Sequence, residues 1–284
     1  MKRRPVAPHF YPGDSAAQIE AFLAGFEPPA EPAKPLAGIV PHAGWAYSGA
    51  VAAKVIKSLQ PLAPEAFVIF GAVHSWGARA GAVYAAGSWD TPLGEARVDE
   101  DLAQLLLGKC PRHLADDAAS HAQEHSIEVQ LPMIKHLHPA AGIVPIAMPP
   151  AETAAGTGAA VGAALAECSR PVAVLGSTDL THYGPSYGFA PWGAGAAARE
   201  KMRENDRRII DLALAFDADN VVAEAHTNSN ACGAGAIAAT AAAAKAMGAY
   251  KATLVEYTTS HDVTGDPPDA FQMAVGYAGI LFGI

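Results

Sequence analysis

Short apolar runs alternate with segments of helical periodicity along almost the whole chain. The apolar runs predict buried strands at residues 37–40, 67–71, 143–148, 172–176, 252–257 and 273–282. The periodic segments predict helices at residues 14–26, 48–59, 99–107, 126–137, 152–167, 194–216 and 233–247. This alternation favours a three-layer α/β/α fold with a mostly parallel or mixed central sheet, and we expect residues 1–284 to form a single domain.

Local signals add detail to two of these helices and to one loop. Asp14 is a suitable N-cap for the first helix, because its carboxylate can accept hydrogen bonds from the free N–H groups of the first turn. Pro132 lies inside the periodic segment 126–137, where it should either kink the helix or stay within its first turns. Residues 178–183 follow a predicted strand and are expected to form a loop.

The composition indicates a folded protein and excludes several classes of partner. Hydrophobic residues make up 51% of the chain and charged residues 17%, which is enough apolar surface for a large core. The net charge of −9 argues against nucleic acid or an anionic membrane as the main partner, because both require clustered Lys and Arg.

The cysteines and the N-terminus indicate a cytoplasmic protein. Cys110, Cys168 and Cys232 are odd in number and far apart, so a disulfide framework is not expected and a reducing compartment is favoured. The basic segment Met1–Pro5 is not followed by the apolar run of a secretory signal.

Two histidines stand directly after predicted strands. His42 follows residues 38–41 and His74 follows residues 68–73, and glycines lie close to both. Ligands of open α/β sheets bind just beyond the carboxyl ends of the strands, so these two imidazoles are candidates to share a metal or a substrate. The alternative is a structural histidine in a glycine-rich turn.

A carboxylate and an imidazole also adjoin the predicted helix 126–137. Glu124 and His125 could hydrogen-bond to the residues of an active site and hold them in place. Alternatively, they could simply cap and solvate the start of the helix. His121, four residues earlier, is expected on the surface.

Two further candidates follow later in the chain. Asp179 and His182 lie in the loop after strand 172–176, where the carboxylate could orient the imidazole as a general acid or base. Cys232 precedes the alanine-rich helix 233–247, and a helix N-terminus favours the thiolate. It could be a ligand or a nucleophile, or a small buried apolar residue.

Taken in order, these segments resemble the motifs of the Memo-like family, also called AmmeMemoRadiSam system protein B. The resemblance covers nearly the whole chain and rests on segments 4–14, 41–49, 91–94, 124–132, 177–184 and 232–233, of which 91–94 resembles the family's strand-to-helix turn. The chain departs from the family pattern at Ser75, where a second histidine is usual, and after Cys232-Gly233, where an arginine often follows.

The resemblance implies a fold shared with class III extradiol dioxygenases, which hold non-haem Fe(II). Carried over by motif, the metal ligands would be His42, His74 and Cys232, and Asp179 and His182 would line the same pocket. Fe(II) is the expected metal. Cu and Zn are alternatives, because the Cys232 thiolate would be a softer ligand than the carboxylate that the dioxygenases use. The family name also suggests a pathway link to a radical-SAM protein and an AMMECR1-like protein.

Three functions remain open at this point. The first is a non-haem metal-dependent redox enzyme of dioxygenase type, with His182, Asp179, His125 and Glu124 as catalytic residues. The second is an adaptor that binds a small molecule or peptide in a vestigial pocket. The third is a zinc-type metallohydrolase. Enzymatic activity and oligomeric state do not follow from the fold.

Overall fold

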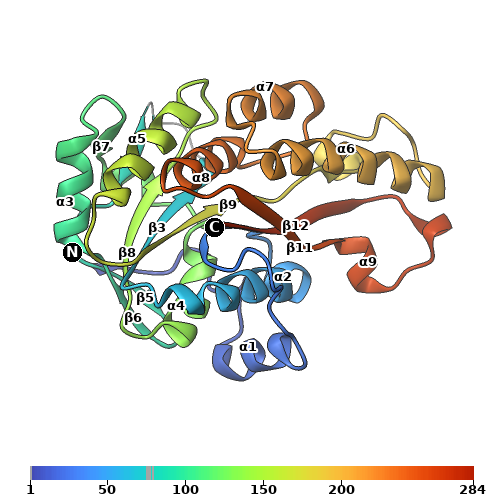
Figure 1. Ribbon diagram of the computed structural model, residues 1–284. Helices are drawn as coiled ribbons and strands as arrows, with labels where there is room; N and C mark the ends of the chain where they lie inside the picture. Colours follow the sequence, from blue (N-terminus) through green and yellow to red (C-terminus); the bar gives the residue numbers. More distant parts are fainter. Residues whose placement is uncertain (1, 75–77, 79) are drawn as a thin grey trace.

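A large mixed sheet forms the centre of the protein (Figure 1). The computed structural model describes residues 2–74, 78 and 80–284. Within this part the strand order is β10-β12-β2-β9-β3-β8-β4-β7, and β11 also pairs with β12. The strands of this sheet are β2 (Pro35–Val40), β3 (Ala66–Gly71), β4 (Gly81–Val83), β7 (Leu114–Asp116), β8 (Gly142–Ala147), β9 (Val172–Ser177), β10 (His182–Tyr183), β11 (Lys251–Thr259) and β12 (Ala274–Gly283).

The middle of the sheet is parallel and almost completely buried. β9 lies between β2 and β3, β8 lies beyond β3, and all four run in the same direction. Their apolar runs have no polar alternation because helices cover both faces of the strands. The carboxyl ends of β2, β9 and β3 therefore meet at one edge of the sheet, and the residues that follow them are brought together.

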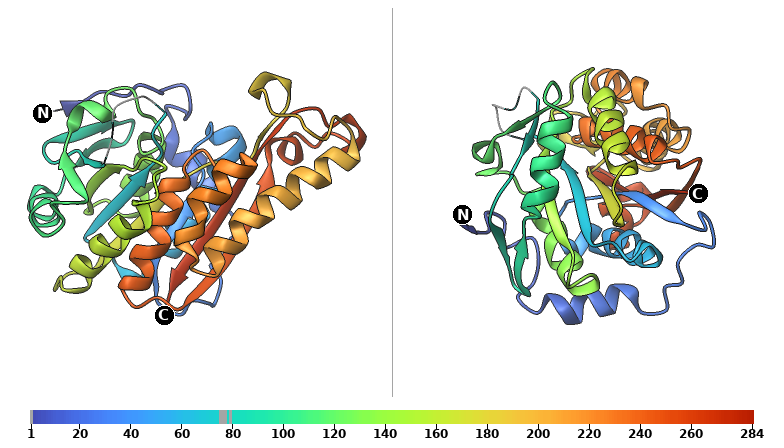
Figure 2. Two further views of the ribbon diagram at one scale, coloured as in Figure 1. Left: turned by 90° about the horizontal axis from the view of Figure 1, so that it is seen from above. Right: turned by 60° about the vertical axis from the view of Figure 1, so that its left-hand side comes forward.

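Helices cover both faces and complete the predicted three-layer α/β/α architecture (Figure 1). α1, α2 and α4 lie on one face, whereas α5, α8, α7 and α6 succeed one another on the other face, which Figure 2 shows from above. The helices are α1 (Ser15–Leu23), α2 (Trp45–Ser58), α3 (Glu100–Lys109), α4 (Leu131–Leu137), α5 (Ala154–Ala166), α6 (Ala196–Leu214), α7 (Ala218–Asn228), α8 (Ala234–Ala246) and α9 (Ser260–Thr264).

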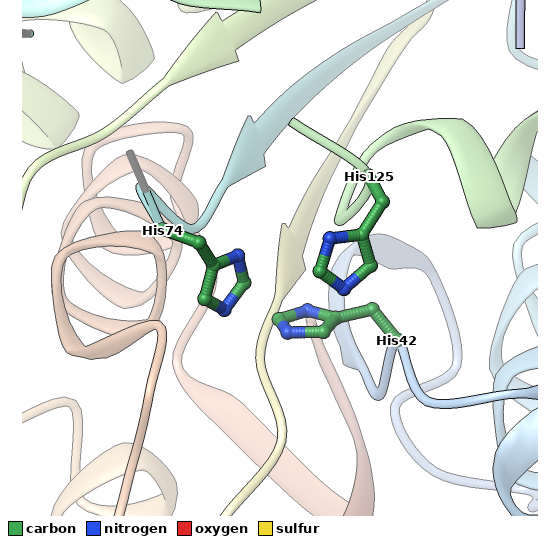
Figure 3. Close-up of side chains that lie close together, drawn as sticks. All are labelled: His42, His74 and His125. Atoms are coloured by element: carbon green, nitrogen blue, oxygen red, sulfur yellow. The ribbon is translucent and has the colours of Figure 1, made fainter. Parts of the chain in front are cut away.

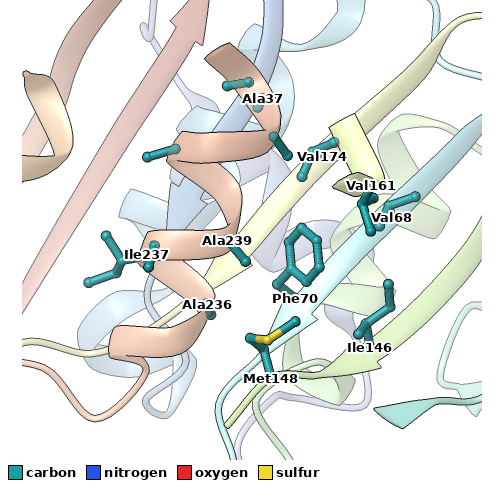
Figure 4. Close-up of a cluster of buried hydrophobic side chains, with 14 of the residues drawn as sticks. Ala37, Val68, Phe70, Ile146, Met148, Val161, Val174, Ala236, Ile237 and Ala239 are labelled. Atoms are coloured by element: carbon teal, nitrogen blue, oxygen red, sulfur yellow. The ribbon is translucent and has the colours of Figure 1, made fainter. Parts of the chain in front are cut away.

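Strand β3 shows how the sheet divides the core. Val68 and Phe70 belong to the core cluster under α5 and α8, and Phe67 and Ile69 belong to the cluster on the opposite face. In Figure 4, Phe70 of β3 lies against the alanine side chains of α8. Each face of the strand thus has its own apolar layer.

The alanine and glycine residues of α5 and α8 allow close helix packing. A Cβ atom at Gly158 or Gly162 would overlap the backbone of Ala239 or Ala243. The two helices approach closely only because these positions lack side chains. Gly158 and Gly162 thus have a direct packing role.

Several boundaries differ from the sequence prediction. The segment 126–137 forms a 3-10 turn at Glu128–Gln130 before α4 begins at Leu131, so Pro132 sits in the first turn, where its missing N–H costs nothing. The helix predicted at 194–216 ends at Leu214, and α7 was not predicted at all.

The N-terminal half contains a small second sheet that was also not predicted. β1 (Lys2–Arg3) pairs with β5 (Ser88–Thr91), which pairs with β6 (Gly94–Arg97). The segment 91–94 therefore turns from strand to strand, and its interpretation as a strand-to-helix turn is wrong. Within the described residues, no helix has the length and apolar character needed to cross a bilayer.

Candidate metal centre

Three imidazoles converge at the carboxyl edge of the sheet. His42 follows β2, His74 follows β3, and His125 lies just before the 3-10 turn that leads into α4. One potential ligand atom from each ring lies within 4.8 Å of the others. Figure 3 shows the three rings around one point. The rings of His74 and His125 stack with centroids 4.8 Å apart, and His42 meets both edge-on.

Glu124 holds two of these histidines in place. Its carboxylate is 1% exposed and accepts hydrogen bonds from the backbone N–H of His74, at 2.8 Å, and from those of His125 and Ser126, both at 2.8 Å. The Nδ1 atom of His74 lies 3.0 Å from Oε1 of the same carboxylate. Nε2 of His74 is thereby left for a metal, with a carboxylate behind the ring, as in many metal sites.

His42 is fixed from the opposite side. Its Nδ1 atom lies 3.0 Å from Oγ of Ser177, which donates its hydroxyl proton to the carbonyl of Ser126. Ser177 Oγ can then accept from Nδ1–H, which leaves Nε2 of His42 unprotonated and available. This Nε2 atom lies 3.2 Å from Sγ of Cys232.

The protonation of the three rings suits metal binding. Burial, with the neighbouring His74 and His125, holds the pKa of His42 well below its usual value. Burial and then His74 also lower the pKa of His125. Burial lowers the pKa of His74, but the hydrogen bond with Glu124 and the charges of Glu124 and Asp179 together outweigh it, so the pKa of His74 is raised. Two neutral imidazoles therefore face one that favours its protonated form, and a cation could replace the proton on Nε2 of His74 while the Nδ1–H stays with Glu124.

Cys232 lies beside this group rather than within it. Its Sγ atom accepts from the backbone N–H of Asp179, at 3.3 Å, besides touching His42. Burial raises the pKa of the Cys232 thiol, and the Asp179 carboxylate adds to the rise. The thiolate expected from the helix N-terminus is therefore not favoured in the metal-free protein. A nitrogen and a sulfur bound to one tetrahedral metal are about 3.5 Å apart, so the contact with His42 still fits a shared ligand set.

Asp179 and His182 were expected to pair with each other, but both side chains have backbone groups as hydrogen-bond partners. Oδ1 of Asp179 accepts from the backbone N–H groups of His42, at 2.7 Å, and Ala43, at 3.2 Å. Nδ1 of His182 lies 3.1 Å from the carbonyl oxygen of Leu180. Asp179 thus orients the loop that carries His42, and His182 is oriented by the backbone.

His121 is buried, so its expected surface position is wrong. Its Nε2 atom lies 2.8 Å from the carbonyl of Ala82, and its ring packs against Tyr84 and Trp89. Burial lowers the pKa of His121 to about 4. The unpredicted sheet β1-β5-β6 brings Trp89 to this position, which the local sequence around His121 does not indicate.

The three imidazoles lie at the floor of a pocket of about 570 Å³. Asp179 and His182 line the same pocket, as the family resemblance implied. Ser75 lies outside the described residues. Four residues of the remaining wall, Phe10, Ala43, Gly44 and Tyr47, stand in segments that resemble family motifs. No pattern in the sequence indicated the other lining residues, which are Tyr187, Ser260, His261, Thr264, Asp266, Met273, Val275 and Tyr277.

A buried acid supports the loop between β9 and β10. Asp206 of α6 accepts from the backbone N–H of Thr181, at 2.9 Å, and from the hydroxyl of Tyr257, at 2.7 Å. Burial raises the pKa of Asp206 to about 7, although these two hydrogen bonds and the nearby Arg203 oppose the rise.

This acid predicts a pH-dependent stability. An unfolded aspartate releases its proton near pH 4, whereas Asp206 in the folded protein keeps it to about pH 7. Between these values the folded state binds more protons, so its stability should fall as the pH rises, by a few kcal/mol in total (about 1.4 kcal/mol per pH unit). Urea unfolding between these pH values should show a steeper fall in the wild type than in Asp206→Asn. Equal slopes in the two proteins would contradict this.

Comparison with known proteins finds relatives that match the chain over nearly its full length. A family model described as "Memo-like protein" matches residues 3–281. A MEMO1 family protein of Thermococcus onnurineus is 38% identical, with 99% of both chains covered. The MEMO1 family protein PF1638 of Pyrococcus furiosus is 36% identical over 99% of this chain and 98% of its own. The corresponding protein of Archaeoglobus fulgidus is 36% identical over 100% of both chains.

A solved structure shows a more distant likeness. The uncharacterized protein JW3007 from Escherichia coli K12 has a TM-score of 0.49 and 15% sequence identity, covering 86% of this chain and 99% of that one. The sequence relatives are much nearer and extend from end to end. On the strength of the family match over residues 3–281 and of these relatives, the chain belongs to the Memo-like family.

Proposed function

We propose that this protein binds a divalent or redox-active metal ion with His42 and His74 and serves as a non-haem metal enzyme of dioxygenase type. The observation that carries the proposal is the group of three imidazoles at the floor of a pocket large enough for a small molecule. Imidazole suits Fe, Cu and Zn, and we take Fe(II) as the first candidate. When bound, such a metal supplies redox chemistry with oxygen or Lewis acidity.

The third ligand is either His125 or Cys232. His125 is favoured by its place in the three-imidazole group, and Cys232 by its contact with His42 and by the family motif. His182, with its ring nitrogens oriented by the backbone, remains the candidate for moving protons within the pocket.

A zinc-dependent hydrolase is the second candidate. Three imidazoles with an open fourth position are a donor set that zinc uses in catalytic sites. A hydrolytic enzyme would not need Cys232, whereas a soft redox metal would gain from its thiolate.

Anaerobic titration with Fe(II) and, separately, with Zn and Co(II) tests the proposal. We expect one metal per chain in the wild type and loss of binding in His42→Ala, with no change in His226→Ala, which removes an exposed histidine of α7 outside the pocket lining. If Cys232 is a ligand, the Co(II) protein should show a thiolate charge-transfer band that is absent in Cys232→Ser. If His125 is the ligand, His125→Ala should weaken binding and Cys232→Ser should not.

Two results would count against the proposal. Protein that holds no metal under anaerobic conditions would favour the adaptor function instead. Metal binding that survives in both His42→Ala and His74→Ala would show that the ion lies elsewhere in the chain.

A further inference from the structure

The outer wall of the pocket has a chemistry of its own. It comes from α9 and the segment that follows, which contribute Ser260, His261, Thr264 and Asp266. Asp266 is exposed at the mouth, and the hydroxyl of Thr264 donates to its Oδ2 atom at 2.7 Å. This hydrogen bond orients the carboxylate but leaves its charge uncompensated. Within the described residues, no Lys or Arg forms an ion pair with it.

The side chains of the lining that are charged whatever the state of the histidines are all acidic. Asp179 and Asp266 are the acidic side chains of the lining, and among the described lining residues there is no Lys or Arg. The Asp179 charge also affects two tyrosines of the lining. Burial, and then the Asp179 carboxylate, raise the pKa of the Tyr187 and Tyr277 phenols. A metal ion held by the imidazoles would offset Asp179, which contacts the His42 backbone, whereas Asp266 is an exposed residue of the segment after α9.

Aromatic rings surround the same mouth. Tyr47 and Tyr187 line the pocket and are each 46% exposed, although large aromatic side chains are usually more buried than this. The face of a tyrosine ring attracts a cation, and a carboxylate next to it adds to the attraction. Met273, 47% exposed, continues this polarisable rim.

We propose that the pocket binds a small organic amine, with one end of the molecule at the metal centre and its ammonium group at the mouth beside Asp266, Tyr47 and Tyr187. This inference rests on the proposed metal function and names the class of ligand for the same site. A cavity of about 570 Å³ is of the size that small-molecule ligands occupy. An anionic tail would be repelled by the Asp266 carboxylate.

Three chelators with the same head and different tails test the proposal on zinc-loaded protein. They are the para-aminomethyl, para-ethyl and para-carboxymethyl derivatives of benzohydroxamic acid, which place an ammonium, a neutral and an anionic group at the same position. By calorimetry we expect the amine to bind about fivefold to tenfold more tightly than the neutral compound, since an exposed ion pair and a cation–π contact each contribute modestly. The carboxylate should bind most weakly, and added salt should reduce the spread.

Asp266→Asn should reduce the advantage of the amine to the part that the tyrosine rings supply and leave the neutral compound unchanged. Asp269→Asn is the matched control, because Asp269 is an exposed acid of the same segment outside the pocket lining. Equal or tighter binding of the carboxylate, or an Asp266→Asn variant that keeps the full preference for the amine, would overturn this inference while zinc binding upheld the metal site. Failure of the zinc loading itself would instead be a failure of the proposed function.

Discussion

Arg3→Met should lower the free energy of unfolding by about 3–5 kcal/mol, because it leaves a buried carboxylate without its cation. Arg3 is 8% exposed and its guanidinium donates to Oε2 of Glu128 at 2.7 Å. The same group donates to the carbonyls of His121, at 3.0 Å, and Glu124, at 2.6 Å, and lies 3.8 Å above the Trp89 ring. The N-terminal strand is thus bound to the segment that carries His125.

Urea unfolding of Arg3→Met, Glu128→Gln and the double variant measures this effect. The double variant should lose less than the sum of the two single variants, since no charge is then left unpaired. Lys201→Met is the matched control: its pair with Glu204 is exposed on α6 and its loss should change stability little. A loss in Arg3→Met no larger than in this control would contradict the buried ion pair.

Glu124→Gln should weaken metal binding about 10–100-fold while the protein remains folded. The carboxylate accepts the ring N–H of His74 and backbone N–H groups on both sides of the site. An amide offers one oxygen in place of two and turns an NH₂ group toward one of these donors. His74 then loses the partner that fixes its tautomer and the direction of its Nε2 atom.

The measurement is a competitive titration of the metal against a chelator of known affinity. Glu256→Gln is the control, since Glu256 is a part-buried acid of β11 that pairs with Lys54 and lies outside the pocket lining. Unchanged affinity in Glu124→Gln would show that His74 does not bind the ion through Nε2. Equal losses in both variants would point to a general effect of the missing charge.

The central strands were predictable because local sequence determines them. β2, β3, β8 and β9 are apolar runs bounded by turn residues, and each is observed within two residues of its predicted bounds. α1 begins after Asp14, which accepts from the Ala17 N–H as predicted. By contrast, β1, β5 and β6 were missed, because they are short strands paired by the N-terminus and carry no periodic signal.

That His42 and His74 would meet was predictable from the sequence, since each follows a buried parallel strand and the carboxyl ends of such strands share one edge. The family resemblance placed Asp179 in the same pocket. The sequence also marked Glu124, His125, His182 and Cys232 as candidates, since each stands in a motif.

The hydrogen-bond partners of these residues could not be read from the sequence and depend on the packed fold. Glu124 binds His74 across 50 residues and Asp179 binds the His42 loop across 137, whereas the local spacing of Asp179 and His182 had suggested a pair. His125 joined the imidazole group, and Asp266 came to the pocket mouth from a part of the chain with no motif. The physical reason is that hydrogen-bond partners and burial depend on which segments the sheet order makes neighbours, and that order is a property of the whole packed core.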